Sequence, residues 1–324
     1  MFKAIASGEL LIDFNSVSAD EMGYPTLAGH PGGATINCLA TLRIFGAEAA
    51  FIGKAGNDAF GKLLLHTINQ LGIDTHNVFL TDDAFTTLAF VTLDETGDRE
   101  FSFARKPGAD LLLHFEEVDL SVFDDADVFH FGTVSMTREP SRQATKDLVE
   151  YARSKGILIG FDPNLRKNLW GSLDEAREQM LWGLSKADIV KISDEEIDFL
   201  YGLDPEEGAQ YILDNYPVKL VYATCGAKGC YYNNRLVKGF TPAMKGLHVI
   251  DTCGAGDIFG GSAMFRFLQL GKAPELLSDS DLQDITRFAS ASAGISTQKH
   301  GGISSIPSLS RRFTPRWRKI HSDC

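Results

Sequence analysis

The chain of 324 residues is 44% hydrophobic and 23% charged, which is ordinary for a soluble protein of one large or two unequal domains. Its formal net charge of −12 argues against nucleic acid or an anionic membrane as a partner. Residues 1–6 lack the apolar core of a signal peptide, and no apolar run approaches the roughly 18 residues that span a bilayer. We therefore expect a cytoplasmic protein, with its scattered cysteines present as reduced thiols: Cys38, Cys225, Cys230, Cys253 and Cys324.

Apolar runs typical of strands alternate with helical patterns along the chain. In order, we predict strand 2–6, helix 34–45, strand 49–52, helix 60–71, strand 128–131, helix 141–154, strand 158–161, helix 173–184, strands 189–192 and 220–223, and helices 258–270 and 281–298. Near-continuous apolar strands separated by helices indicate an α/β fold, with a mostly parallel central sheet and helices on both faces.

One region, within residues 86–105, breaks this rhythm. Residues 86–93 and 99–103 alternate in period two on either side of a turn that contains Gly97, which predicts a β-hairpin. Such an antiparallel flap projects from a parallel sheet. Because ligands of doubly wound sheets bind at the carboxyl ends of the strands, the flap is placed to close over a ligand.

A turn of small residues opens the helix predicted at 258–270. Gly254, Ala255 and Gly256 leave backbone N–H groups of the first helical turn accessible, and the helix dipole adds to their attraction for a phosphate. Asp257 follows at once, and a carboxylate beside a phosphate site is explained if it takes a proton from an attacking hydroxyl. The spacing fits neither the dinucleotide G-x-G-x-x-G fingerprint nor a Walker A loop, so an oxidoreductase is disfavoured.

A second glycine-rich stretch lies near the amino end. Gly32 and Gly33 let a polar ligand approach bare backbone, and Asn37, one helical turn later, offers both a donor and an acceptor. Asp13 is a further acceptor for a hydroxyl group. A helix cap alone would explain the glycines, but not the combination of the carboxylate, the glycine pair and the amide.

These motifs resemble the two signatures of the ribokinase-like, or PfkB, carbohydrate kinases. The resemblance rests on Gly-Gly-x-x-x-Asn at 32–37, GKAGNDAFG at 53–61 and DTCGAGD at 251–257, and it runs from about residue 4 to residue 307. Within the family, GELLIDF at 8–14, REFSFARKPGAD at 99–110 and FDPNLRKNLW at 161–170 look most like fructokinases. The resemblance implies one ribokinase-fold domain over residues 1–309 with a β-lid around 86–105. The arginines and the lysine of residues 310–324 indicate a basic C-terminal tail after it.

The resemblance also implies roles for individual residues, with Mg²⁺-ATP as phosphoryl donor and a sugar as acceptor. Asp257 matches the catalytic base, and Gly254, Ala255 and Gly256 match the anion hole. Sugar binding is assigned to Asp13, Gly32, Gly33, Asn37, Arg105 and Arg166. Contacts with ATP are assigned to Ser193, Thr224, Gly226, Gly229 and Ser290. Glu196 matches a residue that holds hydrated magnesium, and Asp251 matches a possible monovalent-cation (K⁺) ligand.

The chain departs from the family pattern at several positions. Ser193 stands where an Asn is usual, Cys253 replaces a Thr, Ser290 replaces an Asn, and Ala104 replaces an aromatic residue before the lid arginine. The leading interpretation is phosphorylation of fructose to fructose 6-phosphate. A 2-keto-3-deoxygluconate kinase shares the pattern at 162–170, and a catalytically silent sugar-binding protein is the alternative of another class. Lid hairpins of this family often pair between subunits, which makes a homodimer an expectation.

Overall fold

The structure is a computed structural model that describes residues 2–93 and 99–309. The predicted turn at 94–98 and the basic tail at 310–324 lie outside the described residues. No helix of the described ranges is long and apolar enough to cross a membrane. Cys38, Cys225 and Cys230 are buried free thiols, as predicted.

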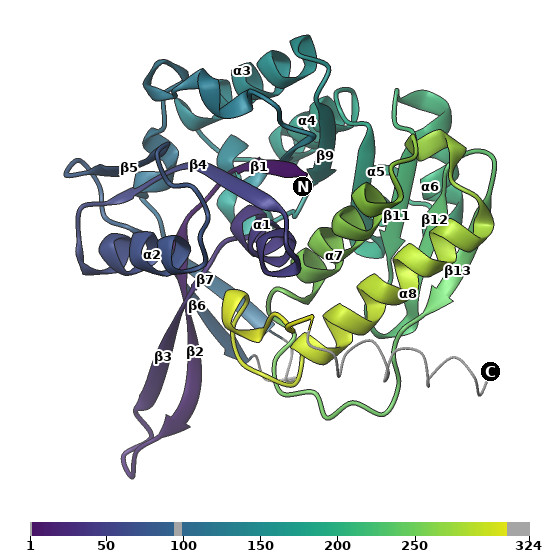
Figure 1. Ribbon diagram of the computed structural model, residues 1–324. Coiled ribbons are helices and arrows are strands. Elements are labelled where there is room, and N and C mark those ends of the chain that lie inside the picture. The colour runs from purple at the N-terminus through teal and green to yellow at the C-terminus, as the bar shows by residue number, and fades with distance from the viewer. Residues whose placement is uncertain (1, 94–98, 310–324) are drawn as a thin grey trace.

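A nine-stranded sheet runs through the described residues (Figure 1). Its order is β13 (Lys238–Pro242), β12 (Gly229–Asn233), β11 (Leu220–Thr224), β10 (Ile189–Ser193), β9 (Leu158–Asp162), β8 (Val128–Gly132), β1 (Lys3–Ser7), β4 (Glu48–Gly56) and β5 (Val78–Thr81). The pairs from β5 to β11 are parallel, whereas β12 and β13 add an antiparallel edge. All six strands predicted for this sheet are present.

Helices cover both faces of this sheet, as predicted. On one face lie α1 (Ala34–Phe45), α2 (Ala59–Gln70), α7 (Ala255–Leu270) and α8 (Asp279–Ser296). On the other face lie α3 (Ser141–Ser154), α4 (Leu173–Leu184), α5 (Asp194–Tyr201) and α6 (Pro205–Asn215). Both faces need cover because successive side chains of a buried strand point to opposite faces of the sheet. In β1, Ala4 and Ala6 pack against the first group of helices and Ile5 against the second. The α5 and α6 helices were not predicted.

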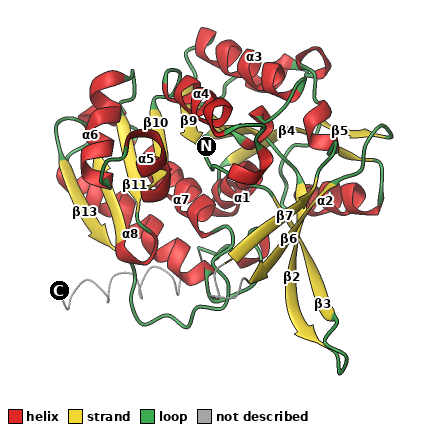
Figure 2. Ribbon diagram, turned by 180° about the vertical axis from the view of Figure 1, so that it is seen from behind, coloured by secondary structure: helices red, strands yellow, loops and turns green. Residues whose placement is uncertain are grey.

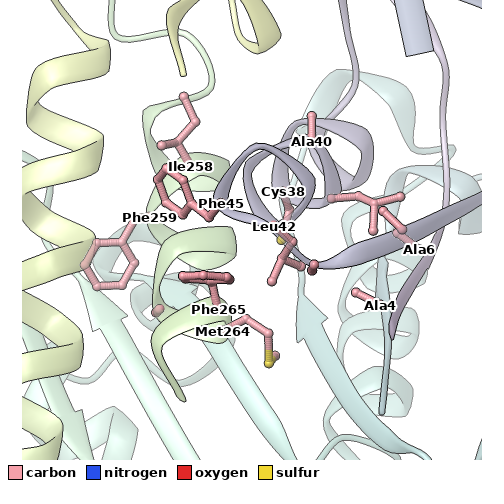
Figure 3. Packing of buried hydrophobic residues seen from close by; sticks show 14 of the residues in the cluster. Ala4, Ala6, Cys38, Ala40, Leu42, Phe45, Ile258, Phe259, Met264 and Phe265 are labelled. Atoms are coloured by element: carbon pink, nitrogen blue, oxygen red, sulfur yellow. The ribbon is translucent and has the colours of Figure 1, made fainter. Parts of the chain in front are cut away.

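The close crossing of α1 and α7 positions the site. A Cβ on Gly261 would lie 2.4 Å from the backbone oxygen of Cys38 and 2.8 Å from Cβ of Thr41, so only glycine fits between the helices. Around this contact Phe45, Phe265 and neighbouring apolar side chains fill the space between the two helices (Figure 3). The first turns of both helices are thereby held side by side.

A second sheet of four strands forms the lid (Figure 2). The predicted hairpin is present as β6 (Thr87–Leu93) and β7 (Arg99–Ala104). The sequence did not predict its other half, the hairpin of β2 (Leu11–Ala19) and β3 (Pro25–Gly32), which extends away from the rest of the fold. Strand β2 follows β1, an interior strand of the main sheet, and pairs in parallel with β6 in the lid.

Candidate active site

A cavity lies where the lid meets the amino ends of α1 and α7. Its lining comes from both ends of the chain and from the loops between them: Glu9, Leu11, Asp13, Gly33, Ala34, Asn37, Phe103, Val134, Asn164, Arg166, Cys253, Gly254 and Asp257. The structure thus brings Gly33 and Asn37 of one predicted motif together with Gly254 and Asp257 of another, more than 200 positions away.

Asp257 stands in the first turn of α7 and faces α1. Its Oδ2 accepts a hydrogen bond of 2.9 Å from Nδ2 of Asn37. The pKa of this carboxyl is raised to about 7, first by desolvation and then by nearby Asp162, against the lowering effect of the Asn37 hydrogen bond. The carboxyl group is therefore poised to exchange a proton near neutral pH.

The start of α7 has the geometry of an anion site. Gly254 adopts φ 74°, and no side chain caps the helix. A Cβ at Gly254 would lie 2.8 Å from Cα of Gly302, so the turn requires glycine. The N–H of Ala255, the first residue of α7, donates back to the oxygen of Thr252 at 3.2 Å, which tightens the turn ahead of Gly256 and Asp257.

Asp13 lies on β2 at the base of the lid and is buried. Desolvation raises its pKa to about 7; Arg166 opposes the shift, while Glu9 and Asp251 add to it. A Cβ on Gly32 would lie only 2.4 Å from Oδ2 of Asp13, so the absence of a side chain keeps this carboxylate accessible.

Gly33 precedes α1 with φ 131°, where a Cβ would meet the backbone oxygen of Glu9 at 2.3 Å. The side chain of Glu9 accepts a 2.6 Å hydrogen bond from the N–H of Ala34, the first residue of α1. Glu9 is buried, and desolvation raises its pKa. This glutamate therefore fixes the start of the helix that presents Asn37.

Asp251 ties together three segments beside the cavity. Its Oδ2 accepts hydrogen bonds from Nδ2 of Asn15 at 3.1 Å and from the N–H of Gly301 at 3.0 Å. Its Oδ1 accepts one of 2.8 Å from the N–H of Cys253, next to the glycine turn. His300 lies 3.6 Å away through Nδ1. One carboxylate thus links the lid to the start of α7.

The two arginines assigned to sugar binding occupy different places. Arg166 lines the cavity. Arg105 does not, because its buried guanidinium donates to Asp110 at 2.5 Å, to Oγ1 of Thr137 at 2.7 Å and to the oxygen of Val134 at 3.0 Å. Val134 is itself part of the cavity wall, so Arg105 supports that wall from behind.

The residues assigned to ATP lie at the carboxyl ends of β10 and β11 and on α8. Ser193 and Thr224 are register partners on the two strands. Gly226 (φ 52°) and Gly229 (φ 136°) shape the turn into β12. Ser290 lies on α8, which packs over the β12–β13 edge through a 2.6 Å contact between Oγ1 of Thr241 and that of Thr286.

Known proteins with similar sequences identify the family. The pfkB family carbohydrate kinase model matches residues 1–309. The chain belongs to that family. Fructokinase-1 of Zea mays is 40% identical over 309 residues, covering 94% of each chain.

Solved structures with a similar fold also include sugar kinases. The fructokinase of Xylella fastidiosa with bound ATP has a TM-score of 0.87 at 29% identity, covering 98% of this chain and 99% of its own. A fructokinase double mutant of Vibrio cholerae, in a form bound to fructose, ADP and potassium ion, has a TM-score of 0.86 at 28% identity, covering 97% and 98%. The predicted ribokinase-like fold and the predicted class, a carbohydrate kinase, are confirmed.

In this pfkB kinase Glu196 caps α5. Its Oε2 accepts from the N–H of Ser193 at 2.8 Å and its Oε1 from that of Leu165 at 2.7 Å. No three His, Cys, Asp or Glu side chains of the described ranges are grouped to hold a bare metal ion.

Sequence reasoning assigned no role to several groups of the site. Glu9, Phe103 and Asn164 line the cavity. Asp162 and Lys191 form a buried ion pair of 3.0 Å behind Asp257. The D-x-N pattern at 162–164 could have indicated Asp162 and Asn164. A single lysine inside an apolar strand, such as Lys191, gives no sequence signal.

Proposed function

We propose that this kinase transfers the γ-phosphoryl group of ATP to fructose, at the hydroxymethyl oxygen on carbon 6. The observation that carries the proposal is the 2.9 Å hydrogen bond between Asn37 and Asp257. It joins the amide that we assign to sugar binding and the carboxylate that we assign as the proton acceptor, and both line one cavity at the start of α7. The names of the similar fructokinases support the choice of sugar.

Asp257 acts as the general base. It accepts the proton of the attacking hydroxyl as the new bond forms between sugar oxygen and phosphorus, and the bond from phosphorus to the β-phosphate oxygen breaks to leave ADP. A base with a pKa of about 7 is well matched to neutral pH. The amides at the start of α7 stabilise charge on the equatorial oxygens, which is the main demand of phosphoryl transfer.

The sugar hydroxyls bind to Asp13 and Asn37, with the backbone at Gly32 and Gly33 packed against the ring. Asp13 is enclosed by protein and near the Arg166 side chain, so it offers a strong acceptor. Arg105 acts through the wall at Val134 rather than as a direct ligand.

The nucleotide extends from the glycine turn toward Ser193, Thr224, Gly226, Gly229 and Ser290. Glu196 would hold a hydrated magnesium ion through water, and that ion, when bound with the nucleotide, would supply further charge neutralisation. A potassium ion beside Asp251 would join a carboxylate that already orders the turn at Cys253.

The lid supports a homodimer. Its β2–β3 hairpin exposes Val17 (50%), Met22 (76%) and Tyr24 (65%), apolar side chains that a second lid would cover. Light scattering should give twice the chain mass, and replacing Met22 and Tyr24 with lysine should return the mass to that of one chain. A monomeric wild-type protein would contradict this part of the proposal.

The proposed reaction is tested by ADP release across a panel of sugars that includes fructose, ribose and 2-keto-3-deoxygluconate. We expect release with fructose, and a loss of about 10²–10⁴-fold in Asp257→Asn with the fructose affinity retained. Asp284→Asn is the control, since it makes the same exchange in a surface ion pair with Arg266. Release with the acidic sugar alone would reassign the substrate. Undiminished turnover in Asp257→Asn, or no release with any sugar, would refute the proposal.

A further inference from the structure

One buried cation of the site has no part in the mechanism so far. Lys191 lies on β10 with its side chain 13% exposed, and its Nζ is 3.0 Å from Oδ2 of Asp162 at the end of β9. Desolvation disfavours its charge, but Asp162, Glu196 and Asp257 together outweigh this and raise its pKa above the ordinary value. The side chain therefore stays an ammonium ion at neutral pH.

The Lys191 ammonium lies beside the first turn of α7. A Cβ built on Gly256 would lie 3.2 Å from Nζ of Lys191. The charge thus faces the open side of the residue that precedes Asp257 in the first turn of α7. Glycine at 256 leaves the approach between Lys191 and the helix start unobstructed.

The surrounding charges also exceed what a structural ion pair needs. One carboxylate, Asp162, would balance Lys191, yet Glu196 and Asp257 also act on it. These groups lie at the carboxyl ends of β9 and β10 and at the start of α7, where an α/β sheet binds its ligands. A fixed cation there attracts an anion in partly desolvated surroundings, where its interaction is stronger than in water.

We infer that Lys191 is a catalytic residue that contacts the transferred phosphoryl group, completing with the α7 amides the charge stabilisation around it. The inference rests on the proposed function, because it takes the triphosphate to enter at Gly256. Lys191 keeps its proton throughout; the proton of the sugar hydroxyl goes to Asp257. Asp162 positions the ammonium through its 3.0 Å ion pair.

Kinetics give the first test. Lys191→Gln removes the charge but keeps a donor for Asp162, and we expect kcat to fall about 10²–10³-fold with the sugar KM changed less than about threefold. Lys191→Arg should recover part of the loss because it keeps the charge. Lys219→Gln is the matched control: Lys219 pairs with Asp188 at 2.9 Å just before β11 and β10, at the opposite end of these strands. Turnover of Lys191→Gln within threefold of wild type overturns the inference.

Nucleotide affinity gives a second test that does not require sugar turnover. Calorimetry should show Lys191→Gln binding a non-hydrolysable ATP analogue about tenfold more weakly, and ADP nearly as well as wild type, because only the triphosphate carries the contacted group. Equal changes for both nucleotides overturn the inference even if the kinase acts on fructose. A selective change upholds it even if the true acceptor is another sugar.

A variant that removes both charges separates a loss of the phosphate contact from a loss of the fold. Taking away one partner of a buried pair is costly, whereas removing both is tolerated better. Lys191→Gln combined with Asp162→Asn should therefore keep the far-UV circular dichroism of the wild type and still show the triphosphate-selective loss. A folded double variant without that selectivity assigns Lys191 a structural role only.

Discussion

The contact between α1 and α7 at Gly261 gives the sharpest test of how the fold builds the site. In Gly261→Ala the new methyl group would meet the oxygen of Cys38 at 2.4 Å and Cβ of Thr41 at 2.8 Å. Both neighbours belong to a packed helix, so α1 and α7 must separate by something on the order of 1 Å. The 2.9 Å bond from Asn37 to Asp257, one turn away, would then be broken or bent.

Two opposing terms set the size of the effect. Overpacking of this kind costs about 1–3 kcal/mol, and the gain in helix propensity from glycine to alanine returns about 0.5–1 kcal/mol. A misplacement of about 1 Å in catalytic geometry can reduce turnover about 10²-fold. We therefore expect a modest loss of unfolding free energy together with a large loss of kcat/KM for the sugar.

The neighbouring residue supplies the control. A Cβ on Gly260 meets nothing within 4 Å, so Gly260→Ala should gain about 0.5–1 kcal/mol from propensity alone. Urea unfolding and coupled ADP release would be measured on both variants. If the two variants proved equally stable and equally active, the helix crossing would not set the catalytic geometry.

Three further predictions address single side chains. Because burial raises the pKa of Asp257 to about 7 and the ionised form is the base, kcat/KM should fall at least about tenfold per pH unit below 7, more steeply where Asp13 is protonated as well, and level off above it; a flat profile from pH 5 to 8 would remove Asp257 as the base. Asp13→Asn should raise the sugar KM at least tenfold with kcat largely kept, as read from saturation curves; an unchanged KM would show that this carboxylate does not hold the sugar. Arg105→Met should lower the free energy of unfolding by about 3–5 kcal/mol because it leaves Asp110 buried without its partner, and adding Asp110→Leu should restore most of it in urea unfolding. A stable Arg105→Met variant with a raised sugar KM would instead make Arg105 a direct ligand.

Local chemistry explains why much of the fold was predictable. The helix at 141–154 carries a regular apolar face, and the parallel strands are buried on both sides, so both show clear patterns. The turn at 254–256 was also readable, because only small residues allow a backbone this tight before a helix.

The missed half of the lid has a physical reason too. In β2 the first residues are buried at the base of the lid and the last four are exposed, so no alternation marks the strand. Strand β3 contains prolines and glycines, a composition that indicates a loop, and its first three residues are exposed.

The site was predictable where one short segment carries the chemistry and not where distant segments meet. Lys191 gains its surroundings from Asp162, 29 positions away, and from the turn at Gly256. From the sequence, Arg105 could be either a ligand contact or one half of a buried ion pair. Its hydrogen bonds to Thr137 and Asp110 in the structure favour the buried pair.

In the proposed mechanism Asp13 and Asn37, from the first 40 residues, bind the sugar, and Asp257, from the last 70, accepts the proton. Cutting the chain anywhere between β11 and α7 would leave each fragment with one half of the reaction machinery. Neither piece could turn over alone, and recovered ADP production on mixing them would report their reassembly. The same arrangement keeps a nascent chain inert during synthesis until its carboxyl-terminal helices have emerged and docked.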